Sequence, residues 1–256
     1  MFYDIFKFFP NNILEIIKEK IIIEKQNELE EISLRANKKI ILKYNSKEEI
    51  LNYIISSQDI LNTLQLICEN SIYTFQKEIC EGYITVKGGH RVGITGNCVI
   101  ENGKVINIIY ISSLNFRIAR QVIGCSNNII EKIINRENKT VNNTLIVSLP
   151  GAGKTTLLRD IVRNISNGVS FFEGQTVGIV DERGEIAAVY KGIPQNDVGL
   201  RTDVLSNISK SIGIKMLIRS MAPKVIAVDE IGNEKDVQAI EEAICSRNKS
   251  YLYGSW

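Results

Sequence analysis

The first half of the chain carries apolar residues at helical spacing in two places, with an alternating pattern between them. Asn11–Lys25 has apolar residues along one side of a helix, and Asn11 or Asn12 is placed to cap its start. A second helical pattern covers about Ser57–Lys77. Glu31–Tyr44 alternates apolar and polar residues around a polar turn, which predicts a β-hairpin. The pattern therefore predicts a small α+β arrangement.

Further apolar runs lie between glycine-rich turns and predict short strands. These strands are expected at Tyr83–Val86, Val92–Thr95, Val105–Tyr110 and Ser113–Arg120. Gly124–Lys139 is expected to form a helix followed by a polar loop. We place a domain boundary near Val122, so that residues 1–122 form the smaller α+β domain.

The pattern changes character in the second half, residues 123–256. Short apolar runs at Thr144–Ser148, Val177–Val180 and Lys224–Val228 alternate with longer helical patterns. This alternation is typical of βα units around a parallel sheet whose strands are buried on both faces. The expected fold class is therefore α/β, with a parallel-sheet domain preceded by a smaller α+β domain.

Composition narrows the functional classes. The 256 residues are 44% hydrophobic and 23% charged, which is ordinary for a globular protein and too apolar for a disordered chain. Lys and Arg number 31 against 29 Asp and Glu, so the net charge of +2 gives no strong positive field, and no direct nucleic-acid partner is expected. No apolar stretch approaches the roughly 20 residues that span a bilayer. Without a transmembrane segment or an export signal, a cytoplasmic protein is expected.

The cysteines and the single histidine do not predict a metal site. The five cysteines form no C-x-x-C pair, and His90 is the only histidine. We interpret the cysteines as reduced thiols that pack as small hydrophobic side chains, with a zinc site or a reactive thiol as the alternative. The chemistry is therefore expected elsewhere in the chain.

The strongest motif is T-L-I-V-S-L-P-G-A-G-K-T-T-L-L-R-D, which begins at Thr144. A buried strand runs into a turn of small residues, and a helix is expected to start at about Lys154. Gly151 and Gly153 can adopt backbone conformations that direct successive N–H groups at one point, where the helix dipole also favours an anion. This arrangement predicts a phosphate-binding loop, with a chance G-K-T in a tight turn as the alternative.

Individual residues of this loop have distinct expected roles. Lys154 is expected to reach the β- and γ-phosphates, and the hydroxyl of Thr155 to hold Mg²⁺. The usual pattern opens with glycine, whereas this loop has Ser148 in that place, and Pro150 lacks an N–H. The residues expected to bind nucleotide are Pro150, Gly151, Ala152, Gly153, Lys154, Thr155 and Thr156.

A partner carboxylate for the metal is expected at the end of a neighbouring strand. The segment K-V-I-A-V-D-E-I-G carries Asp229 and Glu230 to the carboxyl end of a strand, the edge where ligands of open α/β sheets bind. Asp229 is the expected magnesium residue, and Glu230 is a candidate to polarise the attacking water. The alternative is a strand that ends in solvated acids.

A second strand also ends in acidic residues. V-G-I-V-D-E-R-G-E-I contains Asp181, Glu182 and Glu185, so one carboxylate could serve the metal and another the water. Glu182 is therefore a second catalytic candidate beside Glu230 and Lys154. The alternative for Glu182 is a surface charge cluster paired with Arg183.

Several arginines are candidates to sense a γ-phosphate, because a planar guanidinium keeps its charge and suits phosphate. The alternative for each is an ordinary salt bridge. The candidates are Arg91, Arg117, Arg120, Arg201 and Arg219.

Together these motifs resemble the stage III sporulation protein AA family of secretion-type P-loop ATPases, which are related to the motors of type II secretion, type IV pili and type IV secretion. The resemblance covers nearly the whole chain. The segments that carry it are E-I-S-L-R-A-N-K-K, S-I-Y-T-F-Q-K-E-I-C-E-G-Y-I-T-V-K-G-G-H-R-V-G-I-T-G, S-S-L-N-F-R-I-A-R, P-G-A-G-K-T-T-L-L-R-D, V-D-E-R-G-E-I-A, Q-N-D-V-G-L-R-T-D-V-L and I-R-S-M-A-P-K-V-I-A-V-D-E-I-G.

The resemblance implies a RecA-like ATPase domain over residues 123–256 that uses ATP and Mg²⁺. It implies that residues 1–122 form a sensing and oligomerisation domain that packs on a neighbouring subunit, and that the subunits form an AAA-like hexameric ring. It further implies that hydrolysis drives a sporulation channel between mother cell and forespore. The ring would act from the mother-cell cytoplasm beside a membrane-associated partner.

The resemblance also assigns individual residues. It places Lys154 and Thr155 in the Walker A motif, Asp229 and Glu230 in the Walker B motif, and Asp181–Glu185 in an acidic box. Secretion-type motors commonly place the water-activating glutamate in that box, whereas generic RecA-like enzymes place it beside the Walker B aspartate. The choice between Glu182 and Glu230 therefore stays open.

The chain departs from the family pattern at its C-terminal end. After Asn233–Cys245, an expected amphipathic helix, the family continues into a core strand with a His-Gly box, whereas this chain ends in S-R-N-K-S-Y-L-Y-G-S-W. We expect a shortened or frameshifted copy whose nucleotide domain lacks its β-rich end and exposes apolar surface.

Three functional hypotheses remain. The first, favoured for the family, is a motor ATPase with nucleotide between subunits. The second is a ring or scaffold subunit that binds nucleotide with impaired catalysis, suggested by the shortened end. The third is a nucleic-acid-dependent ATPase, against which the small net charge argues.

Overall fold

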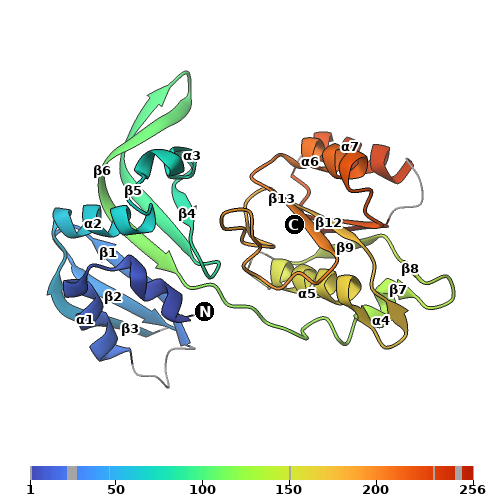
Figure 1. Cartoon of the computed structure of the whole chain (residues 1–256), viewed down its shortest axis with the longest axis horizontal. Helices are drawn as coiled ribbons and strands as arrows, with labels where there is room; N and C mark the ends of the chain where they lie inside the picture. The colour runs from blue at the N-terminus through green and yellow to red at the C-terminus, as the bar shows by residue number, and fades with distance from the viewer. Residues whose placement is uncertain are drawn as a thin grey trace. The chain divides into compact units, whose positions relative to one another are not determined.

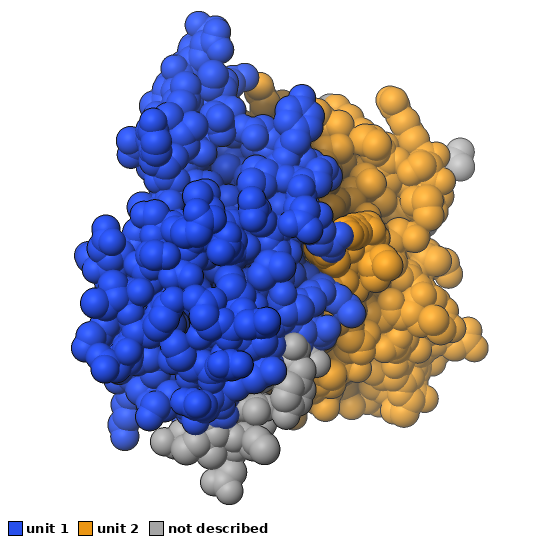
Figure 2. Space-filling model, turned by 60° about the vertical axis from the view of Figure 1, so that its left-hand side comes forward, with its two compact units in different colours: residues 1–120 blue, residues 121–256 orange. Residues whose placement is uncertain are grey.

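The computed structural model describes residues 2–21, 28–45, 47–149, 151–232, 234–245 and 250–255. The chain divides into two compact units, Met1–Arg120 and Gln121–Trp256 (Figure 2). The division lies within two residues of the boundary expected near Val122. The functions expected for the two units stay predictions.

The first unit is built on a six-stranded antiparallel sheet (Figure 1). Its strands lie in the order β3-β2-β1-β6-β5-β4. They are β1 (Leu29–Arg35), β2 (Lys39–Tyr44), β3 (Lys47–Ile54), β4 (Tyr83–Thr85), β5 (Arg91–Glu101) and β6 (Lys104–Arg117). The helices are η1 (Phe2–Phe8), α1 (Asn11–Lys20), α2 (Ser57–Ile67), η3 (Ile72–Phe75) and α3 (Gln76–Cys80). One core joins the helices to the sheet, which confirms the α+β expectation.

The helices of this unit differ from the sequence expectation at their ends. Helix α1 ends at Lys20, and its N-cap is Pro10 without a side-chain hydrogen bond; Asn12 instead donates to Tyr53 and Asp59. Residues 22–25 of the expected first helix lie outside the described residues. The prediction of a single helix over Ser57–Lys77 is wrong. The backbone turns into the left-handed region at residues 69 and 70, so that α2 stops and two short helices follow.

The expected hairpin over Glu31–Tyr44 is confirmed by the antiparallel pairing of β1 and β2. The strands expected at Val105–Tyr110 and Ser113–Arg120 form one strand, β6, that is bulged beside Gly96. A Cβ at Gly96 would lie 2.7 Å from the carbonyl oxygen of Ile109, so glycine permits this close approach.

The second unit contains a five-stranded parallel sheet in the order β13-β12-β14-β15-β9. The strands are β9 (Thr144–Val147), β12 (Val177–Asp181), β13 (Thr202–Ser206), β14 (Val225–Glu230) and β15 (Ser250–Ser255). The helices are α4 (Ile130–Ile133), α5 (Lys154–Asn167), α6 (Lys210–Ser220) and α7 (Glu234–Cys245). Two small ribbons pair β7 (Ile134–Asn135) with β8 (Thr140–Val141), and β10 (Gly168–Val169) with β11 (Phe172–Glu173).

Both faces of this sheet are covered, as the continuous apolar runs predict. Figure 1 shows α5 on one face and α6 with α7 on the other. Along β12, Ile179 faces the core that contains α5, whereas Val180 faces the core that contains α6 and α7. The α/β expectation for the second half is therefore confirmed.

Two expectations for this unit are wrong. Gly124–Lys139 is helical only at Ile130–Ile133, because the preceding residues bind the side of α5 and the following ones pair as β7 and β8. The expectation that the tail cannot supply a core strand also fails. Ser250–Ser255 forms β15, which is inserted between β14 and β9. The tail is stabilised there by backbone pairing on both sides and by the buried Leu252.

Candidate nucleotide-binding site

The loop after β9 has the backbone that a phosphate-binding turn requires. Gly151 and Gly153 have φ values of 75° and 89°. Apart from each glycine and its chain neighbours, no heavy atom of the described residues lies within 4 Å of a Cβ built at either position, so these glycines are required by backbone conformation and not by lack of space. Pro150, expected among the nucleotide-binding residues, lies outside the described residues.

Helix α5 begins at Lys154, as predicted, and its first turn carries the candidate binding groups. The first helical N–H groups, including those of Lys154, Thr155 and Thr156, have no intrahelical acceptor in any α-helix, so they face the region where the loop turns. The Lys154 ammonium donates to the Ser148 carbonyl oxygen at 3.3 Å. The N-terminal end of α5 thus combines free backbone amides, the positive end of the helix dipole and the Lys154 ammonium. Together these groups suit an anionic ligand such as a phosphate chain.

The structure brings Thr155 and Asp229 together from helix and strand. The Thr155 hydroxyl donates to a carboxylate oxygen of Asp229 at 3.2 Å. A hydroxyl and a carboxylate are hard oxygen ligands, and Mg²⁺ is usually held by only one or two protein oxygens together with phosphates and water. The pair therefore fits a magnesium–nucleotide complex.

Asp229 is positioned by an irregularity between β14 and β15. The register shifts between Val228 and Glu230, which pair with Tyr253 and Gly254. A Cβ at Gly254 would lie 2.5 Å from the carbonyl oxygen of Asp229, so glycine permits β15 to pass beside the candidate metal residue. Sequence reasoning missed the role of Gly254, because this glycine lies in a tail that was not expected to form a strand.

The electrostatics of Asp229 reflect a crowded acidic edge. Burial raises the pKa of Asp229 to about 6, and Glu185 and Asp181 contribute to the rise, while the Thr155 hydroxyl and Lys210 oppose it. A cation at this place would relieve the repulsion between these carboxylates. The charge distribution thus favours a bound metal ion.

Asp181 organises the loop that follows β12 instead of facing solvent. Its fully buried carboxylate accepts the N–H groups of Glu185, Ile186 and Ala187 at 2.8, 3.1 and 2.8 Å. Burial raises the pKa of Asp181, against the effect of these three donors. Because its oxygens are occupied by backbone amides, Asp181 is a structural residue of the acidic loop.

Arg159 supports the same loop from α5. It is 7% exposed, and its guanidinium donates to the carbonyl oxygens of Ile186 and Glu185 at 2.6 and 2.7 Å. Burial lowers the pKa of Arg159, whereas Asp181 and Asp229 act in the opposite direction. The helix that carries the phosphate loop is therefore tied directly to the acidic loop.

The two candidate catalytic glutamates have different partners. Glu182 binds the ammonium of the buried Lys210, while Glu230 pairs with Arg183 at 3.5 Å. The pairing of Glu182 with Arg183, given above as an alternative, stays a prediction beside these two ion pairs. Both glutamates lie at the carboxyl ends of neighbouring parallel strands, β12 and β14.

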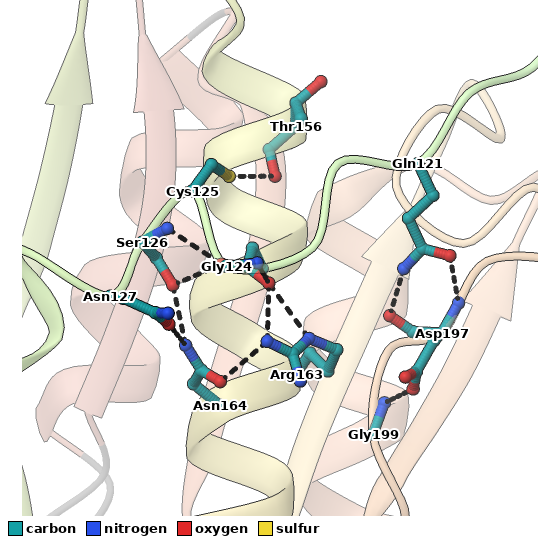
Figure 3. A network of polar contacts seen from close by, with 11 residues as sticks. Gln121, Gly124, Cys125, Ser126, Asn127, Thr156, Arg163, Asn164, Asp197 and Gly199 are labelled. Atoms are coloured by element: carbon teal, nitrogen blue, oxygen red, sulfur yellow. Dashed lines mark hydrogen bonds and ion pairs between the residues drawn. The ribbon is translucent and has the colours of Figure 1, made fainter. Parts of the chain in front are cut away.

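A polar network fixes α5 from its outer side (Figure 3). Asp160 accepts hydrogen bonds from Gly124, Ser126 and Arg163, and Asn164 donates to Ser126. The segment that enters the second unit is thereby bound to the phosphate-loop helix. Sequence reasoning missed this role of Asp160, although an acidic residue at an otherwise apolar position of the helix could have indicated it.

Three of the five arginine candidates, Arg91, Arg117 and Arg201, have local partners. The Arg91 guanidinium lies 4.3 Å from the centre of the Tyr83 ring, and Arg117 pairs with Glu31 at 3.5 Å. Arg201 donates to the Ser166 carbonyl oxygen and directly precedes β13, at the amino edge of the parallel sheet. Its position is therefore wrong for the phosphate loop of its own chain, which follows the carboxyl end of β9.

Comparison with solved structures defines the class of fold. The ATPase DotB of Yersinia pseudotuberculosis matches with a TM-score of 0.59 and 17% identity, over 96% of this chain and 65% of DotB. The pilus retraction motor PilT, solved with bound ADP, matches with a TM-score of 0.57 and 17% identity, over 95% of this chain and 66% of PilT. The chain thus has the fold of RecA-like secretion ATPases and spans just under two thirds of the length of these structures.

Sequence comparison defines the family. Residues 3–250 match the family described as Sporulation stage III, protein AA, and the chain belongs to that family. It is 40% identical to stage III sporulation protein AA of Bacillus subtilis (strain 168) over 241 residues, which cover 91% of this chain and 78% of that protein. No helix within the described part of the chain is long and apolar enough to cross a membrane.

Proposed function

We propose that this chain is a magnesium-dependent ATPase subunit of a secretion-like complex that acts during sporulation. The hydrogen bond of 3.2 Å between the Thr155 hydroxyl and Asp229 carries the proposal, because it joins the helix of the phosphate loop to the acid at the end of β14. The family membership and the fold of secretion ATPases support the same conclusion.

The residues have separate roles in this proposal. The backbone amides from Gly151 to Thr156 bind the phosphate chain, and Lys154 neutralises its β- and γ-phosphates. Thr155 and Asp229 hold the magnesium ion, which when bound neutralises developing charge on the phosphates. The Lys154–Ser148 hydrogen bond keeps the ammonium beside the loop until phosphate oxygens replace the carbonyl.

Hydrolysis needs a carboxylate that orients water. The water oxygen forms a bond to the γ-phosphorus while the bond from that phosphorus to the bridging oxygen breaks, and the carboxylate accepts one water proton. Glu182 and Glu230 are the two candidates, and both lie at the correct edge of the sheet.

The proposed biological setting follows from the family and the fold. The subunits form a hexameric ring in the mother-cell cytoplasm, and a membrane-associated protein of the channel between mother cell and forespore binds that ring. No nucleic acid takes part. The names of the matched proteins and the fold of secretion motors support this setting.

The test is steady-state turnover of magnesium ATP by the purified chain, by Lys154→Ala and by Lys235→Ala, which removes an exposed lysine from α7 as a matched control. We expect turnover by the wild type and the control, and a loss of about 100-fold or more in Lys154→Ala, because the γ-phosphate loses its principal cation. Equal rates in all three proteins would contradict the proposal, as would nucleotide-dependent assembly without turnover, the result expected of a scaffold subunit.

A further inference from the structure

Lys210 is a buried lysine that has no role in the function proposed above. It is 7% exposed, and its ammonium binds a carboxylate oxygen of Glu182. Lysine is almost never this buried unless its charge is paired. The pair therefore needs a structural or functional reason.

The position of Lys210 in its helix is electrostatically unfavourable. It is the first residue of α6, where the helix dipole is positive and disfavours a cation. The N-cap residue, Ser209, makes no side-chain hydrogen bond that would strengthen this end. A lysine at this position does not stabilise the helix, so the interaction that stabilises Lys210 must be the one with the acidic loop.

A glycine brings this end of α6 onto the sheet. A Cβ at Gly213 would lie 2.5 Å from a methyl carbon of Val180, the residue that precedes Asp181 in β12. Only a residue without a side chain permits so close an approach. One helical turn earlier, Lys210 is thereby brought within reach of Glu182.

Within the described part of the chain, Glu230 pairs with a more exposed cation than Glu182 does. Its partner, Arg183, is 65% exposed, and the two charged groups are 3.5 Å apart. Exposed ion pairs contribute little and are screened by salt, so they fix a side chain weakly. Of the two candidate glutamates, Glu182 is the one held by a buried cation.

We infer that Lys210 is a positioning residue that holds Glu182 at the carboxyl edge of the sheet, where Glu182 accepts the proton of the attacking water. This inference rests on the proposed ATPase function and deepens it, because it selects Glu182 over Glu230. Lys210 itself does not touch the reacting atoms.

The experiment compares wild type with Lys210→Met, Lys210→Arg, Glu182→Gln and the double variant Lys210→Met with Glu182→Gln. Lys215→Met, which replaces an exposed lysine on the same helix, is the control. Four quantities are measured for each protein: kcat and KM for magnesium ATP, the Kd of a fluorescent ATPγS analogue, and the Tm without nucleotide.

We expect Lys210→Met to lower kcat by about 10- to 100-fold with KM and Kd changed less than about threefold, because a misplaced base affects the chemical step and not binding. Lys210→Arg should recover most of kcat, since a cation is restored. The double variant should be no slower than Glu182→Gln, and the Tm losses of the two single changes should not add, as expected for one shared interaction.

If the wild type is active and the kcat of Lys210→Met is unchanged or higher, the inference is overturned while the proposed function stands. Losses of kcat that add up in the double variant would have the same consequence. If Lys210→Met does not fold, Lys210→Gln replaces it in the comparison, with the same expected loss of kcat. A kcat unchanged in Glu182→Gln would overturn the inference. A wild type that binds nucleotide without turnover would contradict the proposed function and this inference together.

Discussion

Replacing Asp160 by asparagine tests whether the polar network on α5 holds the phosphate-loop helix in place. Asp160 is 3% exposed and accepts the N–H groups of Gly124 and Ser126 at 3.0 and 2.8 Å, and the Ser126 hydroxyl at 2.7 Å. Arg163 donates two further bonds at 2.9 and 2.8 Å. An asparagine keeps the shape but presents an NH₂ group to donors and loses the charge that faces Arg163.

The size of the effect follows from the pKa of Asp160. Burial tends to raise it, but the amides of Ser126 and Gly124, the Ser126 hydroxyl and Arg163 together lower it to about 2, from an ordinary value of 3.8. A difference of nearly two pKa units corresponds to about 2 kcal/mol of unfolding free energy. Because the folded pKa is lowered, this contribution is complete above pH 4 and is lost as the pH falls towards 2.

At neutral pH the unfolding free energy of the asparagine variant should be about 3 kcal/mol lower than that of the wild type. This loss exceeds the contribution derived from the pKa, because buried donors are also left unpaired. For a domain of this size, such a loss lowers the Tm by about 10 °C. Thermal and urea unfolding, followed by circular dichroism at pH 7 and between pH 4 and 2, measure both effects. Asp203→Asn, at an exposed position on β13, is the matched control and should change stability by less than about 0.5 kcal/mol.

Two outcomes would refute this reasoning. The first is an Asp160→Asn variant whose Tm at pH 7 equals that of the wild type and the control. The second is a parallel loss of stability between pH 4 and 2 in the wild type and the variant, because the variant has no carboxylate at this position to titrate.

Two further predictions concern close contacts near the site. Gly254→Ala places a Cβ against the Asp229 carbonyl oxygen and should lower the unfolding free energy by about 1–3 kcal/mol and weaken nucleotide binding; an unchanged Tm and Kd would contradict this. Arg159→Met leaves the Glu185 carbonyl oxygen without its donor and the Ile186 carbonyl oxygen with Asn196 alone, and should lower the unfolding free energy by about 2 kcal/mol. An unchanged midpoint in urea unfolding would exclude that role.

The local parts of the candidate site could be predicted from the sequence. A strand, a turn with glycines and a helix beginning at Lys154 follow one another in the chain, so neighbouring residues determine the loop. Asp229 was also predictable, because a buried apolar run that ends in an acid marks a strand end. The pairing of Thr155 with Asp229 follows from parallel strands whose carboxyl ends share one edge.

The features that depend on distant pairing could not be predicted in the same way. Leu252 is the one aliphatic residue of the tail Ser250–Ser255, yet two neighbouring strands supply the backbone partners of this tail, which no local pattern reveals. Gly124–Lys139 has a helical pattern, but Asp160 binds the backbone at its beginning and prevents a helix there. The burial of Lys210 depends on how closely Gly213 lets α6 approach β12.

The most direct test of the central claim is the effect of Mg²⁺ on the affinity for a non-hydrolysable ATP analogue. It is measured for the wild type, Thr155→Val and Asp229→Asn. The account predicts that Mg²⁺ tightens binding to the wild type by about tenfold or more, and that either variant abolishes this gain while keeping the affinity measured without Mg²⁺. An undiminished gain from Mg²⁺ in both variants would contradict it.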